Sequence, residues 1–84
     1  MDRRDDAAID AFARSLQRRR RAQGFSQEEL AHRAGLSTSY ISLLETRRRQ
    51  PTLSVMVGLA RELGISLTAM AKDIETPNGK ARGG

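Results

Sequence analysis

The segment from residue 27 to residue 45 constrains the fold of this chain more than any other. It holds two stretches with helical patterns, each about eight residues long, and only three or four residues separate them. Gly35 lies in that interval, and glycine readily adopts the positive φ that a sharp turn requires. This spacing is typical of a helix-turn-helix, in which two short helices meet at a steep angle.

Local signals agree on where both helices begin. Ser26 and Glu29 form the pattern of a capping box, and Phe25 and Leu30 flank it as a hydrophobic staple. Ser37 has the residue type that favours an N-cap for the second helix. The sequence therefore predicts helices that begin at residue 27 and directly after residue 37.

The remaining long segments also have apolar residues at three- and four-residue steps, which favours helix over strand. We predict an all-α fold of five helices without a sheet. Expected helices cover residues 5–23, 27–34, 37–46, 52–64 and 66–75. We expect a polar extension over 1–8, one domain over 9–75, and a flexible tail over 76–84, which has nothing to bury.

Composition excludes several functional classes. The chain has 84 residues, no cysteine and a single histidine, so a disulfide, a thiolate metal site and a histidine-rich zinc site are excluded. No apolar run approaches the roughly 18 residues that a membrane span needs. No titratable groups have a recognisable catalytic spacing. We therefore expect no enzymatic activity, metal, cofactor, small-molecule ligand or membrane contact.

Basic charge is concentrated in one region. Residues 14–49 hold nine arginines against three glutamates, a net charge of +6, whereas the whole chain has +5. A basic surface of this kind favours an anionic polymer as the partner. The alternative is a set of solvated helix faces, which is what most charged runs are.

Two stretches, GFSQEELAHRAGLSTSYISLLE and RRQPTLSVMVGLARELGIS, resemble the lambda-repressor/Cro-type family of helix-turn-helix domains, and the resemblance extends over residues 12–74. It implies a compact five-helix bundle whose segment 37–45 is a recognition helix in the DNA major groove. The implied base-reading residues are Ser37, Thr38, Ser39, Ser42 and Leu43. The alternatives are a plain N-cap at Ser37 and an exposed helix start at Thr38 and Ser39.

The resemblance also implies contacts to DNA phosphates. The implied residues are Gln27, Tyr40, Arg20, Arg47, Arg48 and Arg49. A solvent-exposed helix start is the alternative for Gln27, and simple packing is the alternative for Tyr40. The family often has glycine where this chain has Arg47, so we expect the exit of the third helix to differ from that of its relatives.

Two further implications concern packing. In the family, an arginine late in the first helix often pairs with the glutamate that ends the third, and Arg20 and Glu45 match both positions. Arg19 stands where relatives frequently have an apolar residue, so we expect a thinner core there. A last set, Ile65, Leu67, Met70 and Ile74, either closes the monomer or forms a homodimer interface.

These observations predict a sequence-specific DNA-binding transcriptional regulator, either a stand-alone repressor or a protein like the controllers of restriction–modification operons. We expect a homodimer on a palindromic operator, in the cytoplasm of a bacterium and associated with its nucleoid. Two alternatives stay open. One is an antitoxin that represses its own operon, and the other is a protein–protein adaptor with the same fold.

Overall fold

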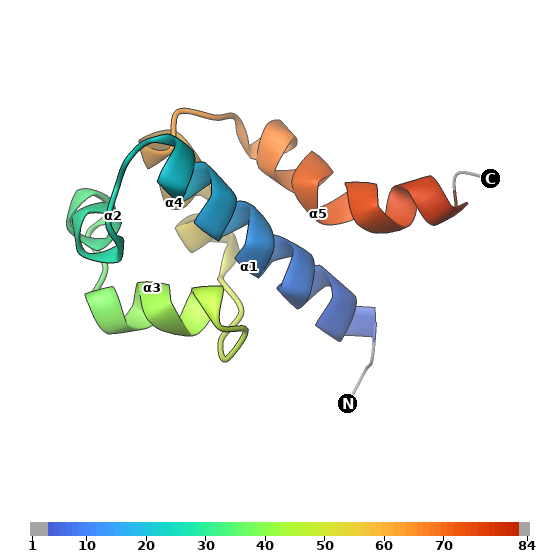
Figure 1. Cartoon of the computed structure of the whole chain (residues 1–84), viewed down its shortest axis with the longest axis horizontal. Coiled ribbons are helices and arrows are strands. Elements are labelled where there is room, and N and C mark those ends of the chain that lie inside the picture. The colour runs from blue at the N-terminus through green and yellow to red at the C-terminus, as the bar shows by residue number, and fades with distance from the viewer. Residues whose placement is uncertain (1–3, 83–84) are drawn as a thin grey trace.

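We analysed a computed structural model of the chain, which describes the backbone of residues 4–82 and the side chains of residues 6–75. The described part contains five helices and no strand, as the sequence predicts (Figure 1). In chain order they are α1 (Arg4–Ala22), α2 (Gln27–Ala34), α3 (Thr38–Glu45), α4 (Leu53–Glu62) and α5 (Leu67–Arg82).

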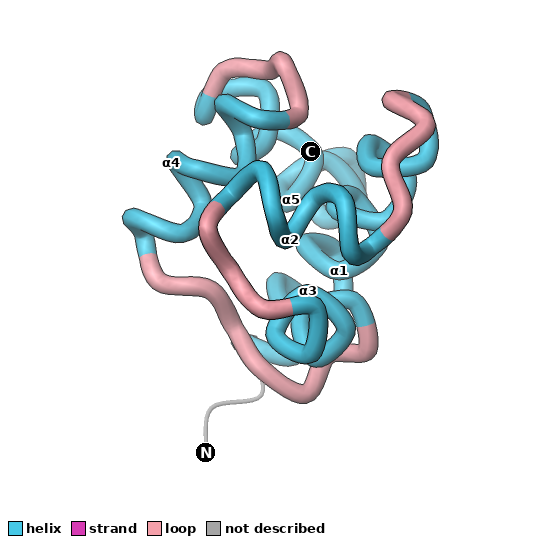
Figure 2. The backbone as a smooth tube through the Cα atoms, turned by 90° about the vertical axis from the view of Figure 1, so that its left-hand side faces the viewer, coloured by secondary structure: helices cyan, strands magenta, loops and turns pink. Residues whose placement is uncertain are grey.

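Helix α1 is central to the arrangement of the other helices. Figure 1 shows α1 crossing the middle of the molecule, with α2 and α3 at one side and α5 running along the other. Figure 2 shows the turn between α2 and α3 from the side, with α3 below α2. The helix-turn-helix therefore lies at one end of the bundle, and α1 and α5 extend from there toward the other end.

Four helices begin with a side-chain cap of the predicted type. The hydroxyl of the capping residue accepts a hydrogen bond from the backbone N–H three residues later, at 2.9–3.1 Å. This contact satisfies one of the N–H groups that a helix start leaves without an intrahelical partner. The capping residues are Ser26, Ser37, Thr52 and Ser66.

Four helices also end in the same way. Each is followed by a residue in the left-handed region, and the next N–H returns to a carbonyl five residues earlier, which is a Schellman motif. Three ends use Gly24, Gly35 and Gly64, and the fourth, at the exit of α3, uses Arg47 with φ 65°. The expectation that this exit differs from its relatives is wrong: the backbone turns as it would with glycine.

The hydrophobic core lies between the five helices, and α1 borders it together with α3 and α5. Its fully enclosed members include one or more residues of every helix. The core cluster is Phe12, Leu16, Leu30, Ala31, Ile41, Leu44, Leu59, Ala60, Leu63 and Met70. In the described part, no single helix is both long and apolar enough to cross a membrane, and α4 with the start of α5 reaches that content only across a 110° bend.

Two details differ from the predicted helices. The apolar spacing of α4 predicts Leu53 on its buried face, but the exposure of Leu53 is 69% because it occupies the first helical position, one turn before the helix reaches the core. Helix α5 continues to Arg82 instead of ending near residue 75. This extension is possible because adding residues to an existing helix requires no new nucleation step. The flexible tail expected over 76–84 stays a prediction, because the side chains of these residues and the backbone of 83–84 lie outside the described part of the chain.

Candidate nucleic-acid interface

The turn between α2 and α3 has the geometry that its sequence predicts. Gly35 has φ 71°, and the N–H of Leu36 donates to the carbonyl of Ala31 at 2.8 Å. Ala31 is only 2% exposed, which agrees with a small residue where two helices cross closely. The turn leaves the start of α3 open to solvent.

Hydroxyl groups surround the start of α3. Ser37 accepts the N–H of Tyr40 at 3.0 Å, so it is an N-cap, whatever else it contacts. Thr38 and Ser39 are exposed in the first turn, whereas Ser42 is half-buried one turn later. The structure therefore presents the first two as open polar side chains, and their base contacts stay a prediction.

The other two predicted residues of α3 are partly covered. Tyr40 and Leu43 are half-buried, and Tyr40 packs against the core cluster. That contact agrees with the packing alternative for Tyr40, although it leaves part of the side chain at the surface.

A buried ion pair fixes the far end of α3 to α1. Arg20 donates to Glu45 twice, from Nε to Oε2 at 2.6 Å and from Nη2 to Oε1 at 3.0 Å. Its remaining Nη1 donates to the carbonyl of Phe25 at 2.8 Å. The side chain of Glu45 is 1% exposed. The pair implied by the family resemblance is therefore present, and its two-point geometry fixes the orientation of α3.

Gln27 completes this buried group. Its Nε2 donates to Oε1 of Glu45 at 3.0 Å, which connects the start of α2 to the end of α3. Burial alone would raise the pKa of Glu45, but hydrogen bonds from Arg20, Gln27 and Gln17 together with the charge of Arg20 lower it below the usual range. Glu45 is thus a carboxylate held in its charged form.

This geometry bears on two of the predicted phosphate contacts, those of Arg20 and Gln27. Arg20 is 8% exposed and all three of its nitrogens donate within the protein, so we retain it only as the structural partner of Glu45. Gln27 keeps a second amide hydrogen and the open start of α2. Its phosphate contact rests on these groups and stays a prediction.

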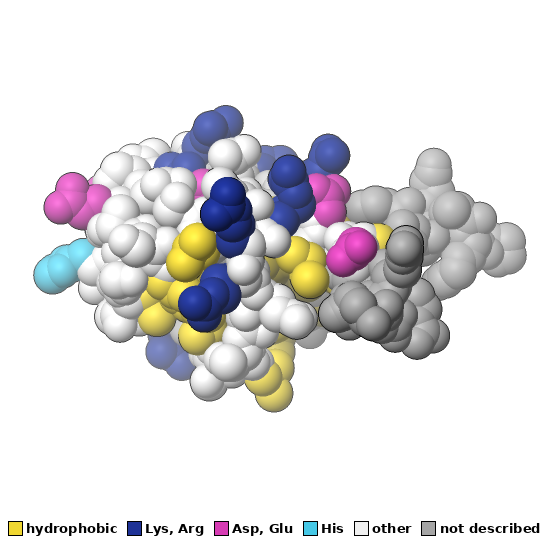
Figure 3. All heavy atoms as spheres, turned by 90° about the horizontal axis from the view of Figure 1, so that it is seen from below, with side chains coloured by type: hydrophobic (Ala, Val, Ile, Leu, Met, Phe, Trp, Pro, Cys, Tyr) yellow, Lys and Arg dark blue, Asp and Glu magenta, His cyan; other side chains and the backbone are white. Residues whose placement is uncertain are grey.

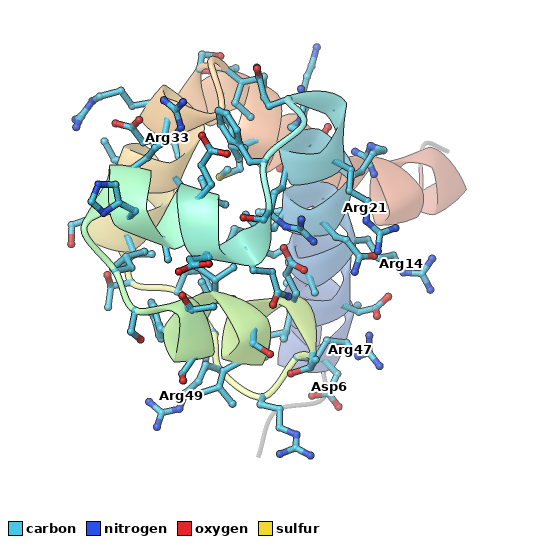
Figure 4. The ribbon with its side chains drawn as sticks, turned by 60° about the vertical axis from the view of Figure 1, so that its left-hand side comes forward. Asp6, Arg14, Arg21, Arg33, Arg47 and Arg49 are labelled. Atoms are coloured by element: carbon cyan, nitrogen blue, oxygen red, sulfur yellow. The ribbon has the colours of Figure 1, made fainter. Side chains whose placement is uncertain are left out.

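The three arginines after α3 are in two different situations. Arg47 returns toward α1, where its Nε is 3.5 Å from Oδ1 of Asp10. Arg48 and Arg49 are exposed and have no carboxylate partner among the described residues. In Figure 4, Arg47 lies beside Asp6 near the start of α1, whereas Arg49 points away from the helices.

Stability alone does not explain an arginine at position 47. A non-glycine residue in the left-handed region costs roughly 1–2 kcal/mol. The ion pair with Asp10 has side chains that are 56% and 38% exposed, and such a pair contributes about 0–1 kcal/mol. The pair at best offsets the strain, so the interactions in the described part of the chain do not account for an arginine at this position.

A second carboxylate that joins two helices is Asp73 on α5, which contacts three side chains of α1. No sequence pattern predicts this cluster. Asp73 accepts from Nε and Nη2 of Arg19 at 2.6 and 3.1 Å and from the hydroxyl of Ser15 at 2.6 Å. Arg18 lies 3.3 Å away. The bond from Arg19 lowers the pKa of Asp73 more than burial raises it. Arg19 thus contributes an ion pair to the α1–α5 contact, at the position where the sequence predicts a thinner core.

The charged side chains are unevenly distributed on the side of the molecule that carries α3. Figure 3 shows this side, with lysine and arginine side chains across its middle and acidic side chains nearer its edges. Four described arginines lack a carboxylate partner within the part of the chain that the structure describes: Arg21, Arg48, Arg49 and Arg61. A positive surface beside an open helix start is suited to a polyanion.

The four residues predicted for a dimer interface differ in how deeply they are buried. Met70 is fully buried, so it belongs to the core of the monomer and does not present a surface to a second copy. Ile65, Leu67 and Ile74 are half-buried and pack against the same core. A role for these three in a dimer stays a prediction.

Comparison with known proteins agrees with this geometry. The family model for helix-turn-helix proteins matches residues 16–70. The HTH-type transcriptional regulator y4dJ of Sinorhizobium fredii is 43% identical over 63 residues, which cover 74% of this chain and 82% of that protein. The HTH-type regulator YqaF of Bacillus subtilis is 30% identical over 59 residues, or 70% and 78% of the two chains.

Solved structures give the same result. The restriction–modification controller protein C.AhdI of Aeromonas hydrophila superposes with a TM-score of 0.71 at 34% identity, and the match covers 74% of this chain and 94% of that one. The clp gene regulator ClgR of Corynebacterium glutamicum has a TM-score of 0.79 at 23% identity, over 83% and 74% of the chains, and it shows the fold alone.

Fold and interface together define a helix-turn-helix DNA-binding protein. The chain belongs to the lambda-repressor/Cro-type helix-turn-helix family of transcriptional regulators. Its function is DNA-binding regulation of transcription.

Proposed function

We propose that this chain is a homodimeric repressor that reads a palindromic operator with the first turn of α3. One observation carries the proposal: the exposed hydroxyls at the start of α3 lie on a helix that the buried Arg20–Glu45 pair holds in place. A helix fixed in this way presents its first turn to a groove without losing orientation on binding. Similarity to a restriction–modification controller supports a regulator of this kind.

Base reading falls to side chains with adaptable chemistry. The hydroxyls of Thr38 and Ser39 donate or accept, and Leu43 is suited to a thymine methyl group. Helix α3 has no Gln, Asn or Arg that would form a two-point contact to one base. Direct readout is therefore modest, and DNA shape or bridging water supplies the rest of the specificity.

Phosphate contacts come from both sides of the helix-turn-helix. Arg48 and Arg49 contribute from the loop after α3, because neither has a carboxylate partner in the described part of the chain. Gln27 and the N-terminus of α2 contribute from the other side. Contacts on both sides position the helix, and base contacts specify the sequence.

Dimerisation through α5 gives the operator its symmetry. The half-buried apolar residues available for this contact are Leu67 and Ile74 on α5 and Ile65 just before it. Two copies related by a twofold axis bind half-sites about 34–36 Å apart, one turn of DNA. Such a dimer acts where its DNA is, in the bacterial cytoplasm.

Selection of bound sequences from a random DNA pool tests this proposal. We expect an enriched inverted repeat with half-sites one turn apart, and a dimer by sedimentation on that DNA. An enriched site without a repeat, bound by a monomer, would contradict the dimer. Failure to enrich any sequence would contradict sequence-specific reading.

Salt dependence tests the phosphate contacts. Each phosphate neutralised contributes about 0.9 to the slope of log K against log salt. Arg48→Gln and Arg49→Gln should each lower that slope by about this amount. Arg61→Gln is the matched control, since Arg61 also lacks a carboxylate partner among the described residues but lies on α4. Equal slopes for all three variants would place the phosphate contacts elsewhere.

A further inference from the structure

Arg47 lies between two possible anionic partners. Its guanidinium is beside Asp10 in a shallow hollow lined by Asp6, Ile9, Asp10 and Arg47. It also belongs to the same loop as Arg48 and Arg49, which the proposed function assigns to phosphates. Figure 4 shows Arg47 directed to the α1 side of the molecule.

The ion pair between Arg47 and Asp10 is of a kind in which another anion can easily replace the carboxylate. The Nε–Oδ1 distance is 3.5 Å, and both side chains are more than a third exposed. By contrast, the Arg20–Glu45 pair has distances of 2.6 and 3.0 Å with almost no exposure. A solvated ion pair at this distance holds a side chain loosely, so a phosphate that comes within reach can replace the carboxylate.

Asp10 has a second cation that makes this exchange easier. Its other oxygen, Oδ2, accepts from Nε of Arg14 at 2.9 Å. When Arg47 leaves, Asp10 therefore keeps one arginine and does not become an isolated carboxylate near DNA. Arg47 has a left-handed backbone (φ 65°) where the chain leaves α3, and its side chain lies beside Asp10 there.

We propose that Asp10 sets the DNA affinity of the regulator by competing with a DNA phosphate for the guanidinium of Arg47. In the free protein Arg47 pairs with Asp10, and in the complex it pairs with a phosphate while Arg14 stays with Asp10. The proposal rests on the proposed phosphate role of the loop. It makes Asp10 a positioning residue that acts through Arg47.

The test compares Asp10→Asn with Asp6→Asn in binding to a fluorescent duplex of random sequence at low salt. Asp6 lies one turn earlier in the same hollow and forms no ion pair with Arg47 in the described part of the chain, so its variant removes an equal charge from the hollow and leaves the Arg47–Asp10 pair in place. We expect Asp10→Asn to bind about twofold to fivefold more tightly than Asp6→Asn, the range that an exposed ion pair supplies. Equal affinities, or weaker binding by Asp10→Asn, would overturn the proposal.

Repeating the comparison in a second variant background tests whether Asp10 acts through Arg47 or through Arg14. Arg47→Gln keeps a non-glycine residue at the strained position but removes the charge. In that background the difference between Asp10→Asn and Asp6→Asn should disappear, and the salt slope should fall by about 0.9 relative to wild type. A difference that persists would mean that Asp10 acts through Arg14, and the proposal would be wrong.

The result also separates this proposal from the proposed function. If the wild-type protein binds the duplex with a steep salt dependence but Asp10→Asn equals Asp6→Asn, only the competition fails. If the wild-type protein does not bind the duplex, both fail. Thermal unfolding of each variant checks that the exposed substitutions leave the fold intact.

Discussion

Two neighbouring arginines of α1 hold the molecule together in different ways. Arg20 points to α3 and forms a two-point pair with Glu45, with side chains 9% and 1% exposed. Arg19 points to α5 and forms a two-point pair with Asp73, with side chains 30% and 15% exposed. The chemistry is the same, so the difference between the two pairs is mainly one of burial.

Burial decides what each pair contributes. Removing one partner of a buried pair leaves an uncompensated charge in the protein interior, whereas water solvates the charge left by an exposed pair. The Arg20 pair also carries the helix that presents the DNA-reading residues. We therefore expect α3 to depend strongly on Arg20, and α5 to depend on Arg19 to a smaller degree.

Glu45→Ala should have the largest effect. It leaves Arg20 buried without its carboxylate, so we expect a loss of about 3–5 kcal/mol in the free energy of unfolding. DNA binding should weaken with it, because α3 loses its fixed end. Urea unfolding measures the loss, and Glu29→Ala, which breaks an exposed pair with Arg33 within α2, is the control. A loss as small as that of the control would show that burial does not distinguish the pairs.

Asp73→Ala should have an intermediate effect. Two hydrogen bonds from Arg19 and one from Ser15 are lost at a partly exposed site, so we expect about 1–3 kcal/mol. Arg18→Gln is a matched test of the same cluster, because it removes only the 3.3 Å contact from a side chain that is 61% exposed. It should change stability by at most about 0.5 kcal/mol. An Asp73→Ala loss equal to that of Glu45→Ala would remove the contrast between the two arginines.

Acid should weaken both pairs. Folding lowers the pKa values of Glu45 and Asp73, so the unfolded chain takes up protons first as the pH falls. Their contribution is complete above the unfolded pKa values of about 4, and it is lost as the pH falls through the lower folded values. Unfolding from pH 7 to 3 should show this decline, and Asp73→Asn should show a smaller one. An unchanged decline would exclude Asp73 as a source.

The two pairs also differ in how far sequence predicts them. Arg20 and Glu45 match positions of a known family, so the resemblance alone is enough to imply their contact. Asp73 gives no such signal, because α1 and α5 are distant in sequence and their contact depends on how α5 turns back along α1. The sequence predicts a thin core at Arg19, and only the fold shows that a carboxylate faces it.

Local chemistry is the most predictable part of the fold. Each N-cap depends on one hydroxyl and a backbone N–H three residues away, so the sequence is sufficient to predict Ser26, Ser37, Thr52 and Ser66. The division of the loop arginines is not predictable in this way. Whether Arg47 or Arg48 meets Asp10 depends on the direction in which the backbone leaves α3.

Arg47→Gly should have the smallest effect, and one of opposite sign. This arginine forms an exposed and long ion pair with Asp10 of α1, and glycine relieves the strain of φ 65° at the loss of that weak pair. We expect the free energy of unfolding to rise by up to about 1 kcal/mol, which raises the melting temperature by a few degrees, while DNA affinity falls. Arg48→Gly is the control, because Arg48 has no positive φ. It should not stabilise the protein, and equal effects of the two variants would show that Arg47 stores no strain.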